Sequence, residues 1–183
     1  MRTSRITPFA LALSVLSGAA FAAGEPPPGG DTQPSPTITK CKKGDVWDEK
    51  KKACAPAKRG AVDDDSIYAA GRDLAYAERH QEAIAVLKAA ANQNDPRILT
   101  YLGYSSRKLG NVDEGMRYYH AAIAANPKYT LVREYLGEAY LQIGNLNAAK
   151  GQLATIKQLC GPRACLEYKD LAEEIAEYER ARL

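Results

Sequence analysis

Residue types that carry chemistry are scarce in this chain. Among 183 residues there are two histidines and four cysteines, and no two cysteines are spaced as C-x-x-C. His80 and His120 lie far from the cysteines and show no metal-ligand spacing, so the sequence predicts no metal site and no thiol-redox motif. There is no Ser-His-Asp or Cys-His set, and Gly29-Gly30 lies in a proline-rich stretch instead of a phosphate-binding loop. We therefore predict a protein that is not an enzyme and holds no cofactor.

An excess of charge of one sign is also missing. The formal net charge is +3, and it includes Arg2 and Arg5 of a segment that we expect to be removed, which leaves 23 basic and 22 acidic residues. Phosphate binding needs a concentrated positive field, so this balance argues against nucleic acid as the main partner. The apolar and charged fractions, 45% and 26%, are those of an ordinary globular protein.

Residues 1–22 have the pattern of a secretory signal peptide. Arg2 and Arg5 form the positive region, Phe9 to Gly18 the apolar core, and Ala-Phe-Ala at 20–22 the small-x-small cleavage site. The apolar run is shorter than the roughly 20 residues that cross a bilayer, so a membrane anchor is the less favoured alternative. No cysteine lies directly after the cleavage site, where a lipid would be attached; the first is Cys41. We expect cleavage before Ala23, export across the inner membrane and no stable membrane insertion.

After export the four cysteines are expected to pair, because the compartment is oxidising. Four cysteines allow three connectivities. Proximity in the sequence favours Cys41 with Cys54 and Cys160 with Cys165.

Two small regions precede the main domain. Residues 23–40 are rich in Pro and Gly and predict an extended linker without helix or core. Residues 41–59 contain Trp47 midway between two cysteines, with turn formers around it, which suggests a disulfide-closed hairpin. From Lys40 to Arg59 there are eight basic and three acidic residues. This module is interpreted either as a solvated cap over the first helix or as an electrostatic contact with an anionic envelope surface or acidic partner.

From Asp63 onward the chain shows a helical pattern that is broken every dozen or so residues by Gly, Asn and Pro. When these breaks are aligned, three segments that begin at Gly71, Gly103 and Gly137 superpose without a gap. The last two are 34 residues apart, and the first precedes the second by 32. A repeat of this length is typical of a two-helix unit.

The repeated residues resemble the tetratricopeptide family. The second unit carries Leu102-Gly103, Leu109-Gly110-Asn111, Tyr119, Ala122 and Asn126-Pro127 at the family's positions. The third unit departs at Leu153 and lacks the closing Pro, and the first has Glu78-Arg79-His80 in place of the Gly-Asn turn. The resemblance implies an all-α, right-handed superhelix of three helix hairpins within residues 60–161, at about 64–95, 96–129 and 130–161.

Residue size and periodicity agree with this architecture. Small side chains recur where two antiparallel helices must approach closely: Gly71, Gly103, Gly137, Ala83, Gly115 and Ala149. In residues 162–183 the apolar Leu166, Leu171, Ile175 and Tyr178 recur at helical spacing opposite a polar, mainly acidic face, as expected for a capping helix that covers the end of a stack. A bridge between Cys160 and Cys165 would hold the turn into this helix.

In family members the first helix of each pair lines a concave groove that binds a peptide or a helix. Carried onto this sequence, the resemblance implies ten groove residues: Tyr68, Arg72, Tyr76, Thr100, Tyr104, Arg107, Lys108, Glu134, Glu138 and Gln142. The groove would be aromatic and basic at its start and acidic at its end. The family's carboxylate clamp is absent, because Arg72, Tyr104 and Glu138 occupy the places where Asn is expected.

The chain also resembles small periplasmic tetratricopeptide proteins of alphaproteobacteria, including the Cys-Lys-Lys-Gly-x-Val-Trp stretch that begins at Cys41. We therefore expect a periplasmic scaffold or adaptor that binds another protein in its groove. The alternative is an envelope-attachment protein whose basic module, Cys41 to Cys54, binds an anionic polymer or surface. The two hypotheses differ in salt dependence, since binding through the lysines should weaken steeply with ionic strength.

Overall fold

The computed structural model describes residues 35–162 and 164–182. The predicted signal peptide and residues 23–34 of the predicted linker lie outside the described residues. Within the described part, no helix has the length and apolar character needed to cross a membrane.

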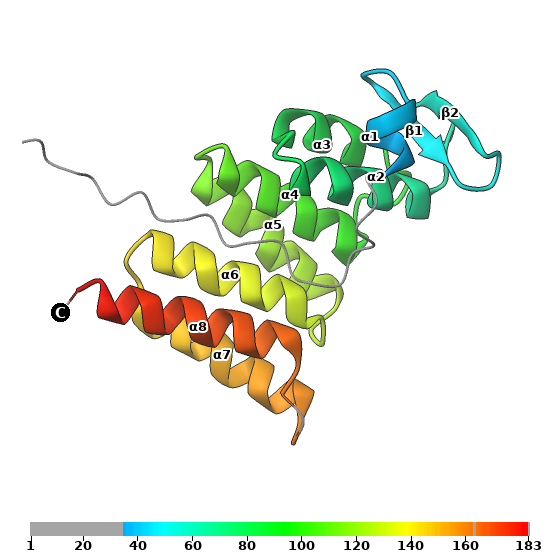
Figure 1. The fold of residues 1–183 in the computed structure, drawn as a ribbon. Helices are drawn as coiled ribbons and strands as arrows, with labels where there is room; N and C mark the ends of the chain where they lie inside the picture. Colours follow the sequence, from blue (N-terminus) through cyan, green and yellow to red (C-terminus); the bar gives the residue numbers. More distant parts are fainter. Residues whose placement is uncertain (1–34, 163, 183) are drawn as a thin grey trace, which may run out of the picture.

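Seven helices of eight residues or more form the main body, which Figure 1 shows as a stack of antiparallel helix pairs. The three pairs begin at Asp64, Pro96 and Thr130, and a single helix follows them. The pairs are α2 (Asp64–Tyr76) with α3 (His80–Leu87), α4 (Pro96–Lys108) with α5 (Val112–Ala125), and α6 (Thr130–Gln142) with α7 (Leu146–Cys160); α8 (Leu166–Arg180) follows them. The mostly helical repeat fold expected from the sequence is confirmed.

Local sequence explains where these helices begin. The Asp63 carboxylate accepts a hydrogen bond from the backbone N–H of Ser66 and so caps α2. Asp95 does the same for α4 through the N–H of Arg97, and Pro96 follows it at the first helical position. Both features satisfy or remove N–H groups that have no partner within the helix.

The turns inside the pairs differ in one respect. Gly110 and Gly144 have φ values of +88° and +81°, in the left-handed region that glycine adopts freely. At the equivalent turn between α2 and α3 the chain places Glu78, with φ +59°. In the first unit, Glu78 therefore adopts the left-handed conformation that glycine adopts in the other two units. This conformation is strained for a residue with a side chain.

The helices of the second pair approach closely where the sequence has glycine. A Cβ atom on Gly103 would lie 2.9 Å from the carbonyl oxygen of Gly115, and one on Gly115 would lie 2.8 Å from that of Gly103. Backbone meets backbone at this point, so neither position has room for a side chain. The expected role of small residues is confirmed for this pair.

The first helices of the pairs form one continuous layer. Helix α2 contacts α4, α4 contacts α6, and α6 contacts α8, while α3 and α5 each pack against the first helix of the next pair. In stacks of this kind the layer of first helices lines the concave side. We call the surface of α2, α4, α6 and α8 the inner face.

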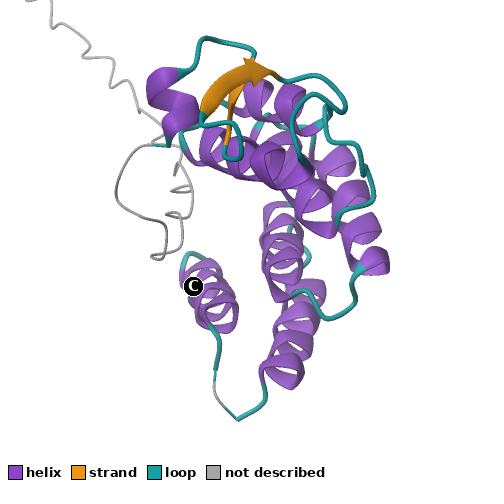
Figure 2. Ribbon diagram, turned by 90° about the vertical axis from the view of Figure 1, so that its right-hand side faces the viewer, coloured by secondary structure: helices purple, strands orange, loops and turns teal. Residues whose placement is uncertain are grey.

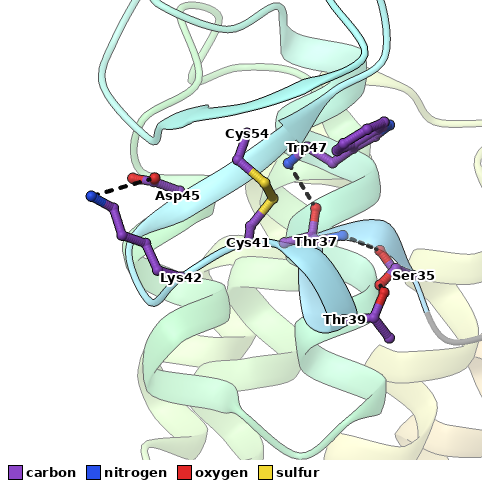
Figure 3. The surroundings of a disulfide bond; sticks show 8 residues. All are labelled: Ser35, Thr37, Thr39, Cys41, Lys42, Asp45, Trp47 and Cys54. Atoms are coloured by element: carbon purple, nitrogen blue, oxygen red, sulfur yellow. Dashed lines mark hydrogen bonds and ion pairs between the residues drawn. A yellow bond between two sulfur atoms is a disulfide. The ribbon is translucent and has the colours of Figure 1, made fainter.

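The N-terminal module is a hairpin whose disulfide is present. Strands β1 (Asp45–Asp48) and β2 (Ala53–Pro56) pair antiparallel with Trp47 opposite Cys54, and Cys54 is bonded to Cys41 (Figure 3). Val46 is fully buried in the same core as α2 and α4, and the Glu49 N–H donates to the hydroxyl of Ser66 on α2. The hairpin is therefore part of the folded body.

One sequence prediction is wrong here. Residues Pro36–Lys40, assigned to an extended linker that cannot be helical, form the short helix α1. The Ser35 hydroxyl caps it by accepting from the Thr37 N–H, and the Thr37 hydroxyl accepts from the Trp47 N–H at 3.0 Å (Figure 3). Proline is compatible with the first position of a helix. A helix of five residues is not stable by itself, and contact with the hairpin supplies the missing stabilisation.

Helix α8 covers the other end of the stack, far from the hairpin (Figure 2). Its buried residues Leu171, Ile175 and Tyr178 form a second core with Leu141, Ala149 and Ile156 of the last pair. Cys160 is bonded to Cys165, the residue before α8. Both cysteine pairs favoured by proximity are thus present in the structure.

Candidate functional site

Tyrosine rings join three first helices across the inner face. Tyr76 on α2 lies edge-on to Tyr101 and Tyr104 on α4, with centroids 5.7 and 6.4 Å apart. Tyr104 in turn contacts Tyr135 on α6 at 4.9 Å. The hydroxyl groups of Tyr76 and Tyr101 are hydrogen bonded at 2.6 Å. Tyr76 is half-buried, and these contacts hold its ring in place.

Arginines flank this aromatic cluster at the start of the inner face. The guanidinium groups of Arg72 on α2 and Arg97 on α4 lie 5.8 and 4.9 Å from the ring of Tyr68. Arg72 also donates to Asp73, and its side chain is 37% exposed. Tyr68, Arg72 and Tyr76 therefore lie together on α2 and are partly exposed.

Thr100 and Tyr104 are not available to a partner in the way expected. Thr100 is completely buried, and its hydroxyl donates to the carbonyl of Pro96 at 2.6 Å. Tyr104 is 9% exposed because rings from α2 and α6 enclose it. Tyr104 lies on the first helix of its pair, as expected, but tyrosines of the neighbouring repeats pack over its ring.

Arg107 is a structural residue rather than a groove ligand. It is 6% exposed, its Nε donates to the Tyr119 hydroxyl at 3.3 Å, and its Nη2 donates to the Glu138 carboxylate. The ion pair joins α4 to α6 and the tyrosine joins both to α5. Lys108, next to it, is half-buried with its ammonium 5.3 Å from the ring of Tyr104.

The acidic end of the inner face contains a buried carboxyl group. Glu134 is 4% exposed, and its Oε2 has no hydrogen-bond partner among the described residues. Burial first, and then the charges of Glu138 and Asp170, raise the pKa of Glu134 to about 9. Glu134 was expected to be exposed, but α8 covers it. Gln142, one helical turn beyond Glu138, is exposed.

Sequence reasoning missed several residues of this face. Arg97 lies on the same side of α4 as Tyr101 and Tyr104, at the second position of its repeat helix, so helix position alone could have identified it. Tyr129 precedes α6, and no periodic signal marks it. Both line an open pocket of about 430 Å³ beside the inner face. The acidic residues of α8 were assigned to a solvated face, but Glu167, Asp170 and Glu174 are half-buried beside α6.

The two histidines occupy ordinary positions. His80 lies edge-on to Tyr104 at 5.9 Å, and burial together with the charge of Lys108 lowers its pKa. His120 is exposed on α5. Within residues 35–162 and 164–182, no group of three His, Cys, Asp or Glu residues is placed to hold a metal ion.

Four of the eight basic residues of the hairpin module, Lys42, Lys50, Lys51 and Lys52, lie beside acidic side chains. Lys51 pairs with Asp48 at 3.0 Å and Lys52 with Glu49 at 2.7 Å. Lys40 lies over the ring of Trp47 at 4.9 Å. Longer contacts of 3.8 Å join Lys42 to Asp45 and Lys50 to Asp63. These contacts dilute the positive field that an anionic surface would require.

Comparison with known proteins agrees with this architecture. Residues 106–159 match the tetratricopeptide repeat family. A search of the curated proteins found no match.

Solved structures with the same fold are found among bacterial chaperones. The type III secretion chaperone SycD of Yersinia enterocolitica, in complex with a peptide of the translocator YopD, has a TM-score of 0.54 and 20% identity, over 64% of this chain and 89% of SycD. A second similar structure is PcrH, known from Pseudomonas aeruginosa, in complex with the chaperone-binding region of PopD. Its TM-score is 0.57 at 18% identity, over 68% of this chain and 98% of PcrH.

A further similar structure is the first repeat domain of Spaghetti (RPAP3), bound to the HSP90 peptide SRMEEVD. Its TM-score is 0.54 at 18% identity, over 63% of this chain and 89% of that domain. All three are complexes with a peptide or a binding region of another protein. The described part of the chain is therefore a tetratricopeptide-repeat fold with an added N-terminal hairpin, and residues 106–159 carry the family's sequence pattern.

Proposed function

We propose that this protein is a non-catalytic binding module that holds a peptide segment or helix of another protein against its inner face. The main support is that Tyr68, Arg72 and Tyr76 form a contiguous, partly exposed set on α2. Ring contacts join this set to α4 and α6. Tyr gives a large contact area with few rotatable bonds, Arg adds several hydrogen-bond donors, and the packing of these side chains restricts their rotamers before a partner arrives. The peptide complexes of similar folds support peptide binding by this architecture.

The setting that we propose is the bacterial envelope, after export to the periplasm. The signal-peptide pattern of residues 1–22 and the two cysteine pairs support it, since disulfides persist in oxidising compartments. An in-frame fusion of residues 1–40 to a reporter active only after export tests the proposal. Reporter activity that is lost when residues 9–18 are deleted is the expected result.

Groove binding is tested with partly exposed residues, because Arg107 and Tyr104 stabilise the fold. The test variant is Arg72→Ala with Lys108→Ala, both on first helices of the inner face. The matched control is Arg117→Ala with Lys157→Ala, which removes the same charges from exposed positions of the second helices α5 and α7. Cross-linking capture from envelope extract should lose its specific partner only with the test variant. Equal capture by both variants would contradict binding at the inner face.

The alternative, attachment through the hairpin module, has less support because four of its eight basic residues lie beside acidic side chains. Deleting the hairpin would expose the core around Val46, so charge removal is the cleaner test. Lys43, Lys58 and Arg59 are exposed and can be changed together to Gln. If this triple variant loses the partner and wild-type capture falls steeply with salt, the hairpin is the binding site instead.

A further inference from the structure

Helix α1 lies against the first helix pair, at the start of the inner face. Ser35 caps α1, and α1 contacts both β1 and α2. Thr37 of α1 and Leu74 of α2 line the same pocket of about 170 Å³, and Leu74 is two residues before Tyr76. Figure 2 shows α1 on the side of the body that also carries α8, a helix of the inner face. The residues that precede Ser35 are therefore joined to the body beside α2.

Twelve residues separate the expected cleavage site from Ser35, and they are long enough to reach along the whole of α2. In a polyproline II conformation, residues 23–34 would span up to about 37 Å, at roughly 3.1 Å per residue. Helix α2 has 13 residues and is about 20 Å long, at 1.5 Å per residue. Residues 23–34 therefore reach Tyr68, Arg72 and Tyr76 even if some of them only bridge the distance from α1.

Residues 23–34 have the composition of a ligand for aromatic surfaces. Pro26, Pro27, Pro28 and Pro34 are four of the twelve residues, and three more are glycine. There is no aromatic residue and no Leu, Ile, Val or Met among them, so they cannot build a core of their own. Proline-rich segments favour the polyproline II conformation, and they lose little entropy when they dock on aromatic-lined grooves.

The start of the inner face has the aromatic side chains that such a segment requires. The half-buried rings of Tyr68 and Tyr76 lie on α2, and contacts with Tyr101 at 5.8 and 5.7 Å hold them in place. The guanidinium group of Arg97 lies 4.9 Å from the ring of Tyr68, and Arg97 also lines the open pocket of about 430 Å³. Proline rings can pack on these tyrosines while an extended backbone continues toward the pocket.

Charge contributes little to such a contact. Arg72 and Arg97 are each bonded to an aspartate, at 2.8 and 2.7 Å, so their charges are already compensated. Residues 23–34 carry two acidic side chains and no basic one. Packing of proline on tyrosine must therefore supply most of the binding free energy, and added salt should weaken it little.

We propose that residues 23–34 bind the inner face at Tyr68, Arg72 and Tyr76 of their own chain, and that a partner must displace them. This inference rests on the proposed function and adds a competitor for the same site. A short tether gives the segment an effective concentration on the order of 1 mM at this face. An intramolecular contact with a dissociation constant of about 0.2 mM would then be formed in most molecules, and it would weaken partner binding about sixfold.

The first test compares the amide resonances of two chains. One chain begins at Ala23, and the other begins at Gln33 and so keeps Pro34 and the Ser35 cap. Amide resonances on the inner face of α2 should differ between the two chains, whereas those of α7 should not. A synthetic peptide of residues 23–34, added to the shorter chain, should restore the resonances of the longer one. Identical α2 resonances in the two chains overturn the proposal. Shifts that grow with protein concentration also overturn it, because a second copy would then supply the segment.

A variant of unchanged length separates recognition of proline from the loss of chain. Changing Pro26, Pro27 and Pro28 together to Ser removes the rings and keeps the tether and both acidic side chains. This variant should show the α2 resonances of the shorter chain. The matched control, Gly29→Ser with Gly30→Ser, should show those of the wild-type chain. A proline variant that is indistinguishable from wild type would refute recognition of the segment.

Partner binding provides the second measurement. Peptides captured on the inner face should bind the shorter chain and the proline variant about three to ten times more tightly than the chain that begins at Ala23. Equal affinity for all three would show that the segment does not compete, which contradicts the proposal. If the α2 resonances ignore the segment but capture still depends on Arg72 and Lys108, this inference fails and groove binding stands. If the resonances respond but no partner is captured, the proposed function fails and the intramolecular contact stands.

Discussion

At the scale of single residues, the sequence indicates where the backbone is strained but does not indicate which side chains are buried. Glu78 stands where the other two repeats have glycine, and its positive φ follows from that alignment. Glu134 resembles any helical surface glutamate in the sequence, yet it is enclosed. The strain at Glu78 could be predicted, because the repeat fixes the backbone conformation of that turn. The burial of Glu134 could not be predicted, because it depends on which helix packs over that position.

We predict that Glu78→Gly stabilises the protein. A left-handed conformation costs a non-glycine residue roughly 1–2 kcal/mol. Glycine's greater loss of entropy on folding offsets about 0.5–1 kcal/mol of the gain. Urea unfolding should show a net increase of about 0.5–1 kcal/mol. Glu78→Ala, which retains the strain, should show no comparable gain; an equal effect of both variants would contradict the role of φ.

Glu134 should make stability fall as pH rises. Its folded pKa of about 9 lies above the ordinary 4.5, so the folded state holds a proton that the unfolded state releases between these values. Stability is full below pH 4.5 and declines toward pH 9, by up to about 1.4 kcal/mol per unit relative to Glu134→Gln. Denaturant unfolding across this window measures the difference. Glu173→Gln should keep the wild-type slope because Glu134 is intact; a flat difference would refute the assignment.

At the scale of elements, the helix pairs are held by contacts of two kinds. Backbone contact at Gly103 and Gly115 sets the distance between α4 and α5. The buried Arg107 then joins α4 to α5 and α6 through Tyr119 and Glu138. Small residues at crossing points follow from the repeat pattern. The ion pair between Arg107 and Glu138 does not follow from the repeat pattern, because an Arg at a groove position looks the same in the sequence whether it is exposed or buried.

Two glycine substitutions in second helices should have opposite effects. Gly115→Ala places a methyl group 2.8 Å from a backbone oxygen and should destabilise by about 1–3 kcal/mol. Gly151→Ala meets nothing within 4 Å in α7 and should stabilise by about 0.5–1 kcal/mol, because alanine loses less entropy in a helix. Thermal unfolding of the two variants compares them directly. Similar effects of both would show that the close approach does not limit the α4–α5 pair.

At the scale of the molecule, the two ends of the stack are closed differently. The hairpin and α1 close the first end and share the larger core, while α8 closes the other and forms a separate core with α6 and α7. In stacked repeats each unit contacts only its neighbours, so the ends can open independently.

Leu171→Ala should loosen only the C-terminal end. Leu171 is fully buried and would contact any Cβ on Gly137, so its truncation should remove about 2–5 kcal/mol of local stability. Hydrogen exchange measured by mass spectrometry should accelerate in α7 and α8 and stay unchanged in α2 and α3. Uniform acceleration along the chain would indicate one cooperative unit instead.

The sequence alone determined the helix pairs, their period and the pairing of the cysteines, because these depend on local spacing, turn residues and proximity. The family resemblance also predicted that the first helices of the three pairs share one face, to which the structure adds α8. Only the tertiary structure decided which residues on that face are free, since burial of Thr100, Arg107 and Glu134 depends on side chains from neighbouring repeats and from α8. The helix at Pro36–Lys40 likewise forms against the hairpin. Periodicity gives the direction of a side chain, whereas its exposure is set by what packs above it.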